Sequence, residues 1–291
     1  MANKFFFIWL TDWFLKKVNH PKAMWVFEKL VYLWFLVFAL VLFPIKDILY
    51  GTDSFMFGVR LDDGLLNNFF LKLVYSKSWA TKIYFLHVGA ALWAFIGIPK
   101  VFHFVPKIIV FLTGWMFYYA APPVFNGGYV LMISYSFFLI FSLPNSRSNF
   151  WIVLTNLSYI GIVLQLLVVY STAAILKWQG HTWIDGSAAW LAANYSTYQN
   201  DTMLRFFSKN HWFALIINYA AFGYQTVFPL LVWFRKIKKP LLFIGVVFHL
   251  YTVFVMGIHF FGIAMMLAYL LFLDEKSKFI HFFWKRRVGN F

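Results

Sequence analysis

The sequence contains no cysteine and few charged residues, above all few acidic ones. Its 291 residues include 25 Lys and Arg but only 10 Asp and Glu, and charged residues make up 12% of the chain. The absence of thiols excludes disulfides, iron–sulfur clusters and thiolate zinc sites, and we predict no metal site. Soluble domains carry roughly 25% charged residues, so a water-covered globular fold is excluded. Disorder is excluded as well, because it requires low hydrophobicity.

Apolar residues are abundant instead, with 62% of the chain hydrophobic and 24% aromatic. A transmembrane helix needs ~20 mostly apolar residues, and several apolar runs of about that length end at prolines such as Pro44 and Pro99. We therefore predict an all-α, polytopic membrane bundle of about eight transmembrane helices, forming one domain over residues 1–291. The predicted spans cover residues 25–43, 83–98, 105–121, 129–143, 151–176 and 212–234, with two more inside 240–273.

Lys and Arg lie in short clusters between the apolar runs, and their placement orients the predicted bundle. Cytoplasmic segments of membrane proteins carry an excess of Lys and Arg, which places both termini in the cytoplasm. Residues 1–22 then form an amphipathic N-terminal segment, 276–291 a basic cytoplasmic tail, and 44–82 and 177–210 extracytoplasmic loops. The net charge of +15 fits a protein whose partner is the lipid bilayer, and we predict no nucleic-acid partner.

Four ionisable side chains in or beside the predicted spans are singled out as candidates: His87, His249, His259 and Lys177. Such groups are costly at membrane depth, which points to function. Each histidine has a structural alternative, in which it bonds a backbone carbonyl or a neighbouring hydroxyl. Lys177 ends a span on the outer side, so it is either an anchor that snorkels to the interface or a partly desolvated base.

The residues after Lys177 favour the second interpretation of this lysine. Lys177, Gly180, Trp183 and Gly186 recur every three residues, and glycines allow sharp turns and close approach. The following stretch, 187–209, is predicted to form an amphipathic cover. Its membrane-facing residues would be Trp190, Leu191, Tyr195, Leu204 and Phe207. A polar site covered by aromatic side chains suits an amphipathic or lipid-like ligand.

At these residues the sequence resembles the horizontally transferred transmembrane (HTTM) family, which is related to vitamin K-dependent gamma-carboxylase. The resemblance rests on three elements between about residues 80 and 275. They are Lys177-x-x-Gly180-x-x-Trp183-x-x-Gly186, Phe248-His249 followed by Met256-Gly257-Ile258, and Asn126-Gly127-Gly128 before a span that stops at Leu143-Pro144.

The resemblance implies a quinone- or lipid-linked membrane enzyme with its site open to the outer face. By this matching, Lys177 and His249 are the catalytic candidates, with Lys177 as the base that deprotonates a quinone or vitamin K-like hydroquinone. Trp183, Asp185 and Asn126 are the candidate ligand-binding residues. In the carboxylase a histidine occupies the loop of Asn126, and a large C-terminal domain follows the membrane part. The resemblance also implies the bacterial cytoplasmic (inner) membrane as the location.

A second hypothesis remains open, that of a non-catalytic membrane subunit that binds or matures a partner protein. The partner would be a secreted peptide or a thioredoxin-like protein, again by resemblance to bacterial-type relatives. A transporter is a third possibility, but the sequence shows no internal repeat and no paired broken helices. A ligand-filled cavity beside Lys177 would favour the enzyme, and a stable complex with another protein would favour the subunit.

Overall fold

The computed structural model of the protein describes residues 14–15, 17–51, 54, 65–97, 102–194 and 201–288. Within these ranges the chain forms helices and no strands, which confirms the predicted all-α class. The segments predicted at 1–22, 44–82, 177–210 and 276–291 lie partly outside the described residues, at 1–13, 16, 52–53, 55–64, 195–200 and 289–291.

Five of the described helices are long and apolar enough to cross a membrane, so the chain is built as an integral membrane protein compatible with a lipid bilayer. They are Pro21–Leu49, Ser78–Ile96, Asn149–Gln179, His211–Leu231 and Arg235–Phe254. Three shorter apolar helices are Phe104–Ala120, Gly127–Ile140 and His259–Phe272. Each predicted span corresponds to one of these helices, whereas the count of eight crossings stays a prediction.

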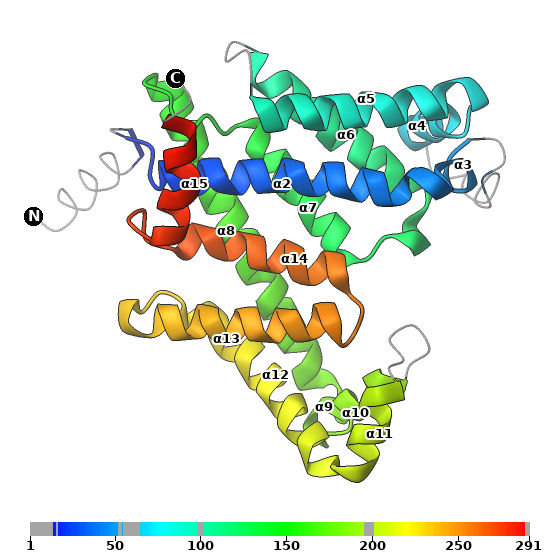
Figure 1. Ribbon diagram of the computed structural model, residues 1–291, viewed down its shortest axis with the longest axis vertical. Coiled ribbons are helices and arrows are strands. Elements are labelled where there is room, and N and C mark those ends of the chain that lie inside the picture. The colour runs from blue at the N-terminus through cyan, green and yellow to red at the C-terminus, as the bar shows by residue number, and fades with distance from the viewer. Residues whose placement is uncertain are drawn as a thin grey trace, which may run out of the picture. The chain divides into compact units, whose positions relative to one another are not determined.

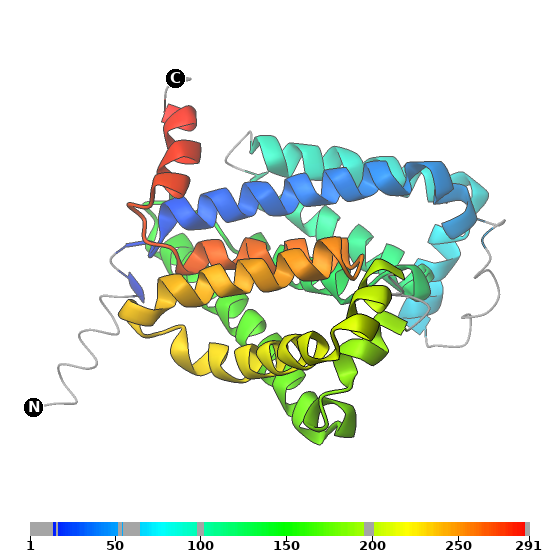
Figure 2. The ribbon, with the colours of Figure 1, turned by 60° about the horizontal axis from the view of Figure 1, so that its bottom comes forward.

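The chain divides into two compact units, and unit 1 comprises residues 1–162 and 273–291. Four helices pack in sequence, each against the next: α2 (Pro21–Leu42), α5 (Lys77–Ile96), α6 (Phe104–Ala120) and α7 (Gly127–Ile140), seen side by side in Figures 1 and 2. Aromatic rings fill the space between α2 and α7. Trp34 stacks on Phe38 with ring centroids 4.9 Å apart, and Phe38 contacts Tyr129 at 4.8 Å.

Unit 1 also contains short helices in the range 44–82, which the sequence predicts to be a polar loop. They are η1 (Phe43–Ile45), α3 (Lys46–Leu49) and α4 (Leu65–Val74), and α5 begins already at Lys77. Two of the polar residues that suggested a loop, Asn67 and Asn68, lie within α4, whereas Asp53, Asp62, Asp63 and Gly64 lie outside the described residues. The described part of this range is therefore helical, because its polar residues share helices with buried ones such as Leu71 and Val74.

Unit 2 comprises residues 163–272, beginning within α8 (Asn149–Gln179). It continues with α9 (His181–Ile184), α10 (Ala188–Asn194), α11 (Asp201–Lys209), α12 (His211–Leu231), α13 (Arg235–Phe254), α14 (His259–Ala268) and η4 (Tyr269–Phe272). Helices α13 and α14 form a hairpin (Figure 1) with a turn around Gly257, as the sequence predicts for this long apolar run. The described part of 177–210 is mainly helical.

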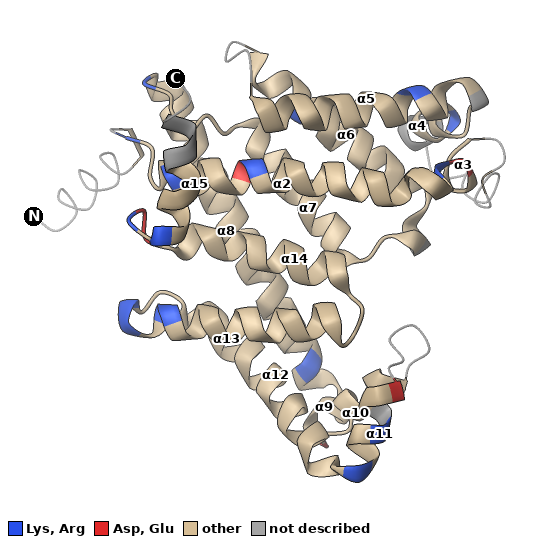
Figure 3. Ribbon diagram, in the orientation of Figure 1, with Lys and Arg blue, Asp and Glu red and all other residues tan. Residues whose placement is uncertain are grey.

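The charged residues lie mostly towards the ends of helices, and the apolar middles carry few (Figure 3). Helix α2 is an exception, because Glu28 and Lys29 interrupt its apolar sequence.

The position of Phe207 differs from the sequence prediction, in which this side chain faces the membrane. It is fully buried in a cluster with Ala193 and Ala214, because α11 packs this face against α10 and α12.

Candidate functional site

Lys177 lies in the last turn of α8, and the chain then folds back so that Trp183 lies beside its side chain. The Nζ atom is 4.3 Å from the centroid of the Trp183 ring. A cation held over an indole face gains about 0.5–2 kcal/mol, more when water is excluded. Lys177 is half-buried, so its amine is fixed by a neighbour rather than extended freely into solvent.

The two glycines of the three-residue pattern make this fold-back possible. A Cβ atom on Gly180 would lie 3.1 Å from Trp183 Cδ1, so a side chain there would displace the indole ring. Gly186 has φ +86°, in the left-handed region that glycine adopts readily. A side chain at Gly186 would also overlap Leu215 on α12. The spacing seen in the sequence therefore has a local structural cause.

Helix α12 holds the backbone around Trp183 with two hydrogen bonds. Asn218 Nδ2 donates to the carbonyl oxygen of Trp183 at 3.0 Å, and the Tyr219 hydroxyl donates to the carbonyl oxygen of Ile184 at 2.9 Å. These side chains are adjacent on α12 and bond adjacent carbonyls of α9. The indole ring is therefore positioned by its backbone as well as by Lys177.

Lys177 and Trp183 line a cavity of about 190 Å³ that lies entirely within unit 2. Its walls come from α10, α11, α12, α13 and the α13–α14 turn, and most of the lining is apolar. The remaining lining residues are Ala189, Ala192, Ala193, Met203, Ile217, Asn218, Ala221, Gln225, Phe248, Tyr251, Thr252, Val255, Met256, Ile258 and Phe261. An apolar cavity with a few polar groups is typical of a small-molecule site.

Two amide side chains on α12 supply polar atoms to this cavity. Asn218 is fully buried and Gln225 is 7% exposed. Among the residues that the structure describes, Asn218 Oδ1 and Gln225 Oε1 have no hydrogen-bond partner. Leaving a buried acceptor unpaired costs about 1–3 kcal/mol. The two oxygens therefore offer binding positions for the O–H or N–H groups of a ligand.

His249 lies on α13 in a separate group of buried side chains, the tyrosine–histidine cluster of Tyr170, Tyr224, His249 and Tyr269. His249 Nε2 and the Tyr170 hydroxyl are 2.7 Å apart, and the Tyr170 hydroxyl also bonds that of Tyr269. The Tyr269 and Tyr224 hydroxyls are 3.0 Å apart. His249 is not among the residues that line the cavity, although its neighbours Phe248 and Thr252 are. Its hydroxyl partner comes from another helix, α8.

Asp185 and Asn126, both predicted to bind ligand, have local structural roles. Asp185 is exposed and accepts a hydrogen bond from the backbone N–H of Ser187 at 2.8 Å. Hydrogen bonds from the Ser187 hydroxyl and N–H hold the pKa of this carboxyl below its usual value. Asn126 belongs to unit 1, where its side chain accepts from Gly128 N at 2.9 Å and caps α7. Of the five candidates, the structure brings together Lys177 and Trp183 in the cavity lining.

The two other histidines singled out in the sequence differ in their surroundings. His87 is buried in unit 1, with its Nδ1 2.7 Å from Thr113 Oγ1 on the neighbouring helix α6. This is the hydroxyl contact expected of a structural histidine. His259 is exposed at the first position of α14.

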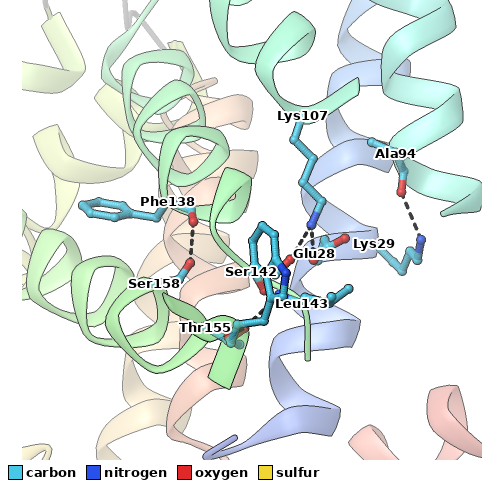
Figure 4. Close-up of polar contacts among 10 residues, drawn as sticks. Glu28, Lys29, Ala94, Lys107, Phe138, Ser142, Leu143, Thr155 and Ser158 are labelled. Carbon is cyan, nitrogen blue, oxygen red and sulfur yellow. Dashed lines mark hydrogen bonds and ion pairs between the residues drawn. The ribbon is translucent and has the colours of Figure 1, made fainter. Parts of the chain in front are cut away.

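A buried ion pair in unit 1 is not among the candidates predicted from the sequence. Lys107 Nζ is 2.8 Å from Glu28 Oε2 and donates to the carbonyl oxygen of Ser142 at 2.8 Å (Figure 4). Glu28 is 7% and Lys107 2% exposed. Nearby, Lys29 Nζ donates to the Ala94 carbonyl at 3.0 Å. A carboxylate within the first apolar run was the signal that could have revealed this pair.

Comparison with known proteins adds no functional assignment. No protein-family model, curated protein or solved structure matches this chain. The functional proposal below therefore depends on the cavity beside Lys177 and on the side chains that line it.

Proposed function

We propose that unit 2 binds the ring-shaped headgroup of an amphipathic, quinone-class or lipid-like molecule, with Lys177 as its main polar contact. The observation that carries this proposal is the half-buried Lys177 amine beside Trp183 in a mostly apolar cavity of about 190 Å³. An apolar cavity of ~150 Å³ holds a benzene-sized ligand. The space here is therefore sufficient for one substituted ring.

The polar atoms of the cavity favour a ligand that carries hydroxyl groups. Asn218 Oδ1 and Gln225 Oε1 are acceptors without partners among the described residues, so they pair with donors. They lie seven residues apart on one helix, which is about two turns along α12. A hydroquinone has two hydroxyl donors on an apolar ring, whereas a plain hydrocarbon chain would leave both acceptors unpaired.

We further propose that Lys177 is the base of a proton transfer. In its neutral form the amine accepts the proton of a ligand hydroxyl, so that one O–H bond breaks, one N–H bond forms and the ligand becomes an anion. The ammonium then remains beside the Trp183 ring, which favours the positively charged form. We also propose, from the sequence resemblance, that the chain is of the HTTM type. His249 would act indirectly in this proposal, through the tyrosine–histidine cluster behind Phe248 and Thr252.

The ligand can be tested by titrating the purified full chain with a vitamin K-like hydroquinone under reducing conditions. We expect Lys177→Met to weaken binding about tenfold or more, because hydrogen bonds to charged groups contribute about 1.5–3 kcal/mol. Asn218→Leu should weaken it about fivefold, the effect of one neutral hydrogen bond. Lys236→Met is the control, because Lys236 is exposed at the start of α13 and outside the cavity lining. Unchanged binding by Lys177→Met would refute the proposal.

A second variant separates holding the ligand from taking its proton. Lys177→Arg keeps the positive charge, but the guanidinium remains protonated in proteins. We expect this variant to bind the ligand but not to deprotonate it. Deprotonation is measured by the ultraviolet absorbance of the hydroquinone anion. If purified protein instead retains another polypeptide and no ring-containing lipid, the non-catalytic subunit is the better description.

We also propose that the three shorter apolar helices cross the bilayer, which gives eight spans. Both termini would then lie on the cytoplasmic side of a bacterial inner membrane. The natural absence of cysteine allows single cysteines to be introduced and labelled from outside. A cysteine at Ser187 should react with a membrane-impermeant maleimide in intact cells, and one at Ser146 should react only after lysis. The opposite labelling pattern would show that the membrane orientation is the reverse of the one proposed.

A further inference from the structure

A basic cleft of about 550 Å³ lies in unit 1, apart from the residues discussed above as a ligand site. Its lining includes Lys17, Val18, Lys22, Arg147, Ile152 and Trp284. We propose that this cleft binds the phosphate-bearing headgroup of an anionic phospholipid. The proposal is independent of the function proposed for unit 2.

The position of the cleft places it where membrane helices meet the headgroup region. Helix α2 begins at Pro21, α7 ends at Ile140 and α8 begins at Asn149. The cleft is lined by residues next to or within the first turn of these ends, together with Trp284 of α15 (Lys278–Val288). The ends of apolar helices mark the boundary between hydrocarbon and water, which is the depth of a phospholipid phosphate.

The charge of the cleft is entirely positive. Its lining includes the cations of Lys17, Lys22 and Arg147 and no acidic residue. Within the described part of the chain, none of these three side chains forms an ion pair. Basic pockets at the ends of membrane helices bind anionic lipid headgroups for this reason.

The neighbouring carboxylate of Glu275 has a different role. Its two oxygens accept hydrogen bonds from the backbone N–H groups of Lys22 at 3.2 Å and Ala23 at 3.1 Å. These are orphan donors of the first turn of α2, and a carboxylate there is stabilised by the helix dipole. Glu275 thus caps the helix, and the side-chain ammonium of Lys22 stays available to a ligand.

The segment that carries Lys17 is fixed in place by α8. The fully buried Asn156 donates through Nδ2 to the carbonyl of Lys17 at 3.0 Å, and its Oδ1 accepts from Asn19 N at 2.8 Å. His20 then adopts φ +53°, a left-handed conformation uncommon for a residue with a side chain. Its ring stacks on Tyr159 with centroids 5.0 Å apart. The basic side chains therefore project from an ordered turn.

An apolar and aromatic wall favours a lipid over a free phosphate ion. Val18, Ile152 and Trp284 line the cleft beside the cations. Trp284 lies 6.0 Å from Lys22 Nζ and packs edge-on against Trp25. Tryptophan is enriched at headgroup level, where its ring contacts both lipid glycerol and acyl carbons. A soluble phosphate would use the cations but leave this wall unused.

The test measures how phospholipids raise the unfolding temperature of the detergent-solubilised full chain. Phosphatidylglycerol is compared with phosphatidylcholine of the same acyl chains, and with inorganic phosphate and glycerol phosphate. We expect phosphatidylglycerol to stabilise the protein at a lower concentration than phosphatidylcholine. The two soluble phosphates should have little effect. Equal stabilisation by phosphatidylcholine would overturn the proposal, and equal stabilisation by either soluble phosphate would overturn the choice of a lipid.

The variant Lys17→Gln/Lys22→Gln/Arg147→Gln removes the cations of the cleft. Each cation near an anionic lipid contributes about 1 kcal/mol, so half-saturation should shift about fivefold per substitution and on the order of 100-fold for all three. The single variants give the same answer if the triple variant does not fold.

A matched control removes the same kinds of charge from unit 2. Arg235, Lys236 and Lys239 are all exposed near the start of α13. Their triple substitution by glutamine should leave the half-saturation concentration within about twofold, because none of these three residues lines the cleft. An equal loss in this control would show general attraction to anionic micelles and refute a specific site.

Discussion

The buried Glu28–Lys107 pair provides the sharpest test of the packing in unit 1. Lys107→Met removes the ammonium but leaves the carboxylate of Glu28, which is only 7% exposed, without its partner at 2.8 Å. Removing one member of a buried pair costs about 3–5 kcal/mol, because an uncompensated charge stays buried. The carbonyl of Ser142 also loses the donor that now lies 2.8 Å away.

The double variant Glu28→Met/Lys107→Met should recover about half of this loss. It removes both charges and replaces them with flexible apolar side chains, leaving mainly the unpaired Ser142 carbonyl at a cost of about 1–3 kcal/mol. We therefore expect the double variant to be about 2 kcal/mol more stable than Lys107→Met. The measurement is reversible unfolding in mixed micelles, followed by circular dichroism at 222 nm.

Two results would contradict this reasoning. One is a loss below about 1 kcal/mol for Lys107→Met, which would place the pair in contact with water. The other is a double variant less stable than the single one. Lys29→Met serves as the control, because Lys29 is half-buried and donates to the Ala94 carbonyl. It should lose about 1.5–3 kcal/mol, the value of a hydrogen bond to a charged group, and so less than Lys107→Met.

Two further predictions concern unit 2. A methyl group in Gly245→Ala would overlap the hydroxyls of Tyr224 and Tyr269, so thermal unfolding should show a loss of about 1–3 kcal/mol. Tyr224→Phe should partly rescue it, and equal losses with and without this second change would contradict the overlap. The Asp185 carboxyl should titrate below 3.8 by NMR, and Ser187→Ala should raise its pKa by removing the hydroxyl donor. A depressed pKa adds stability above the usual pKa, and this is lost as the pH falls through the folded value. An unchanged titration in Ser187→Ala would assign the shift to another cause.

Particular residues show how far the sequence could predict the site. Lys177 and Trp183 were singled out by their three-residue spacing with Gly180 and Gly186, because glycines allow the chain to turn sharply. Asn218 and Gln225 were missed, because one polar residue in an apolar helix gives no sign of which neighbour it faces. The hydrogen-bond partner of His249 could not be predicted either, because Tyr170 lies 79 residues away in the sequence. The pairing of Lys107 with Glu28 was missed as well, because the two residues lie 79 positions apart in different predicted spans.

Composition and the length of the apolar runs were enough to predict an all-helical membrane protein and where its apolar helices lie. Those properties are local along the chain, and the thickness of the bilayer sets the length of the runs. Which polar groups lie close together depends on the tertiary structure: Lys177 lies beside Trp183, Glu28 pairs with Lys107, and Lys17, Lys22 and Arg147 line one cleft. These groups come from different helices and connecting segments, and local periodicity does not encode the packing that brings them together.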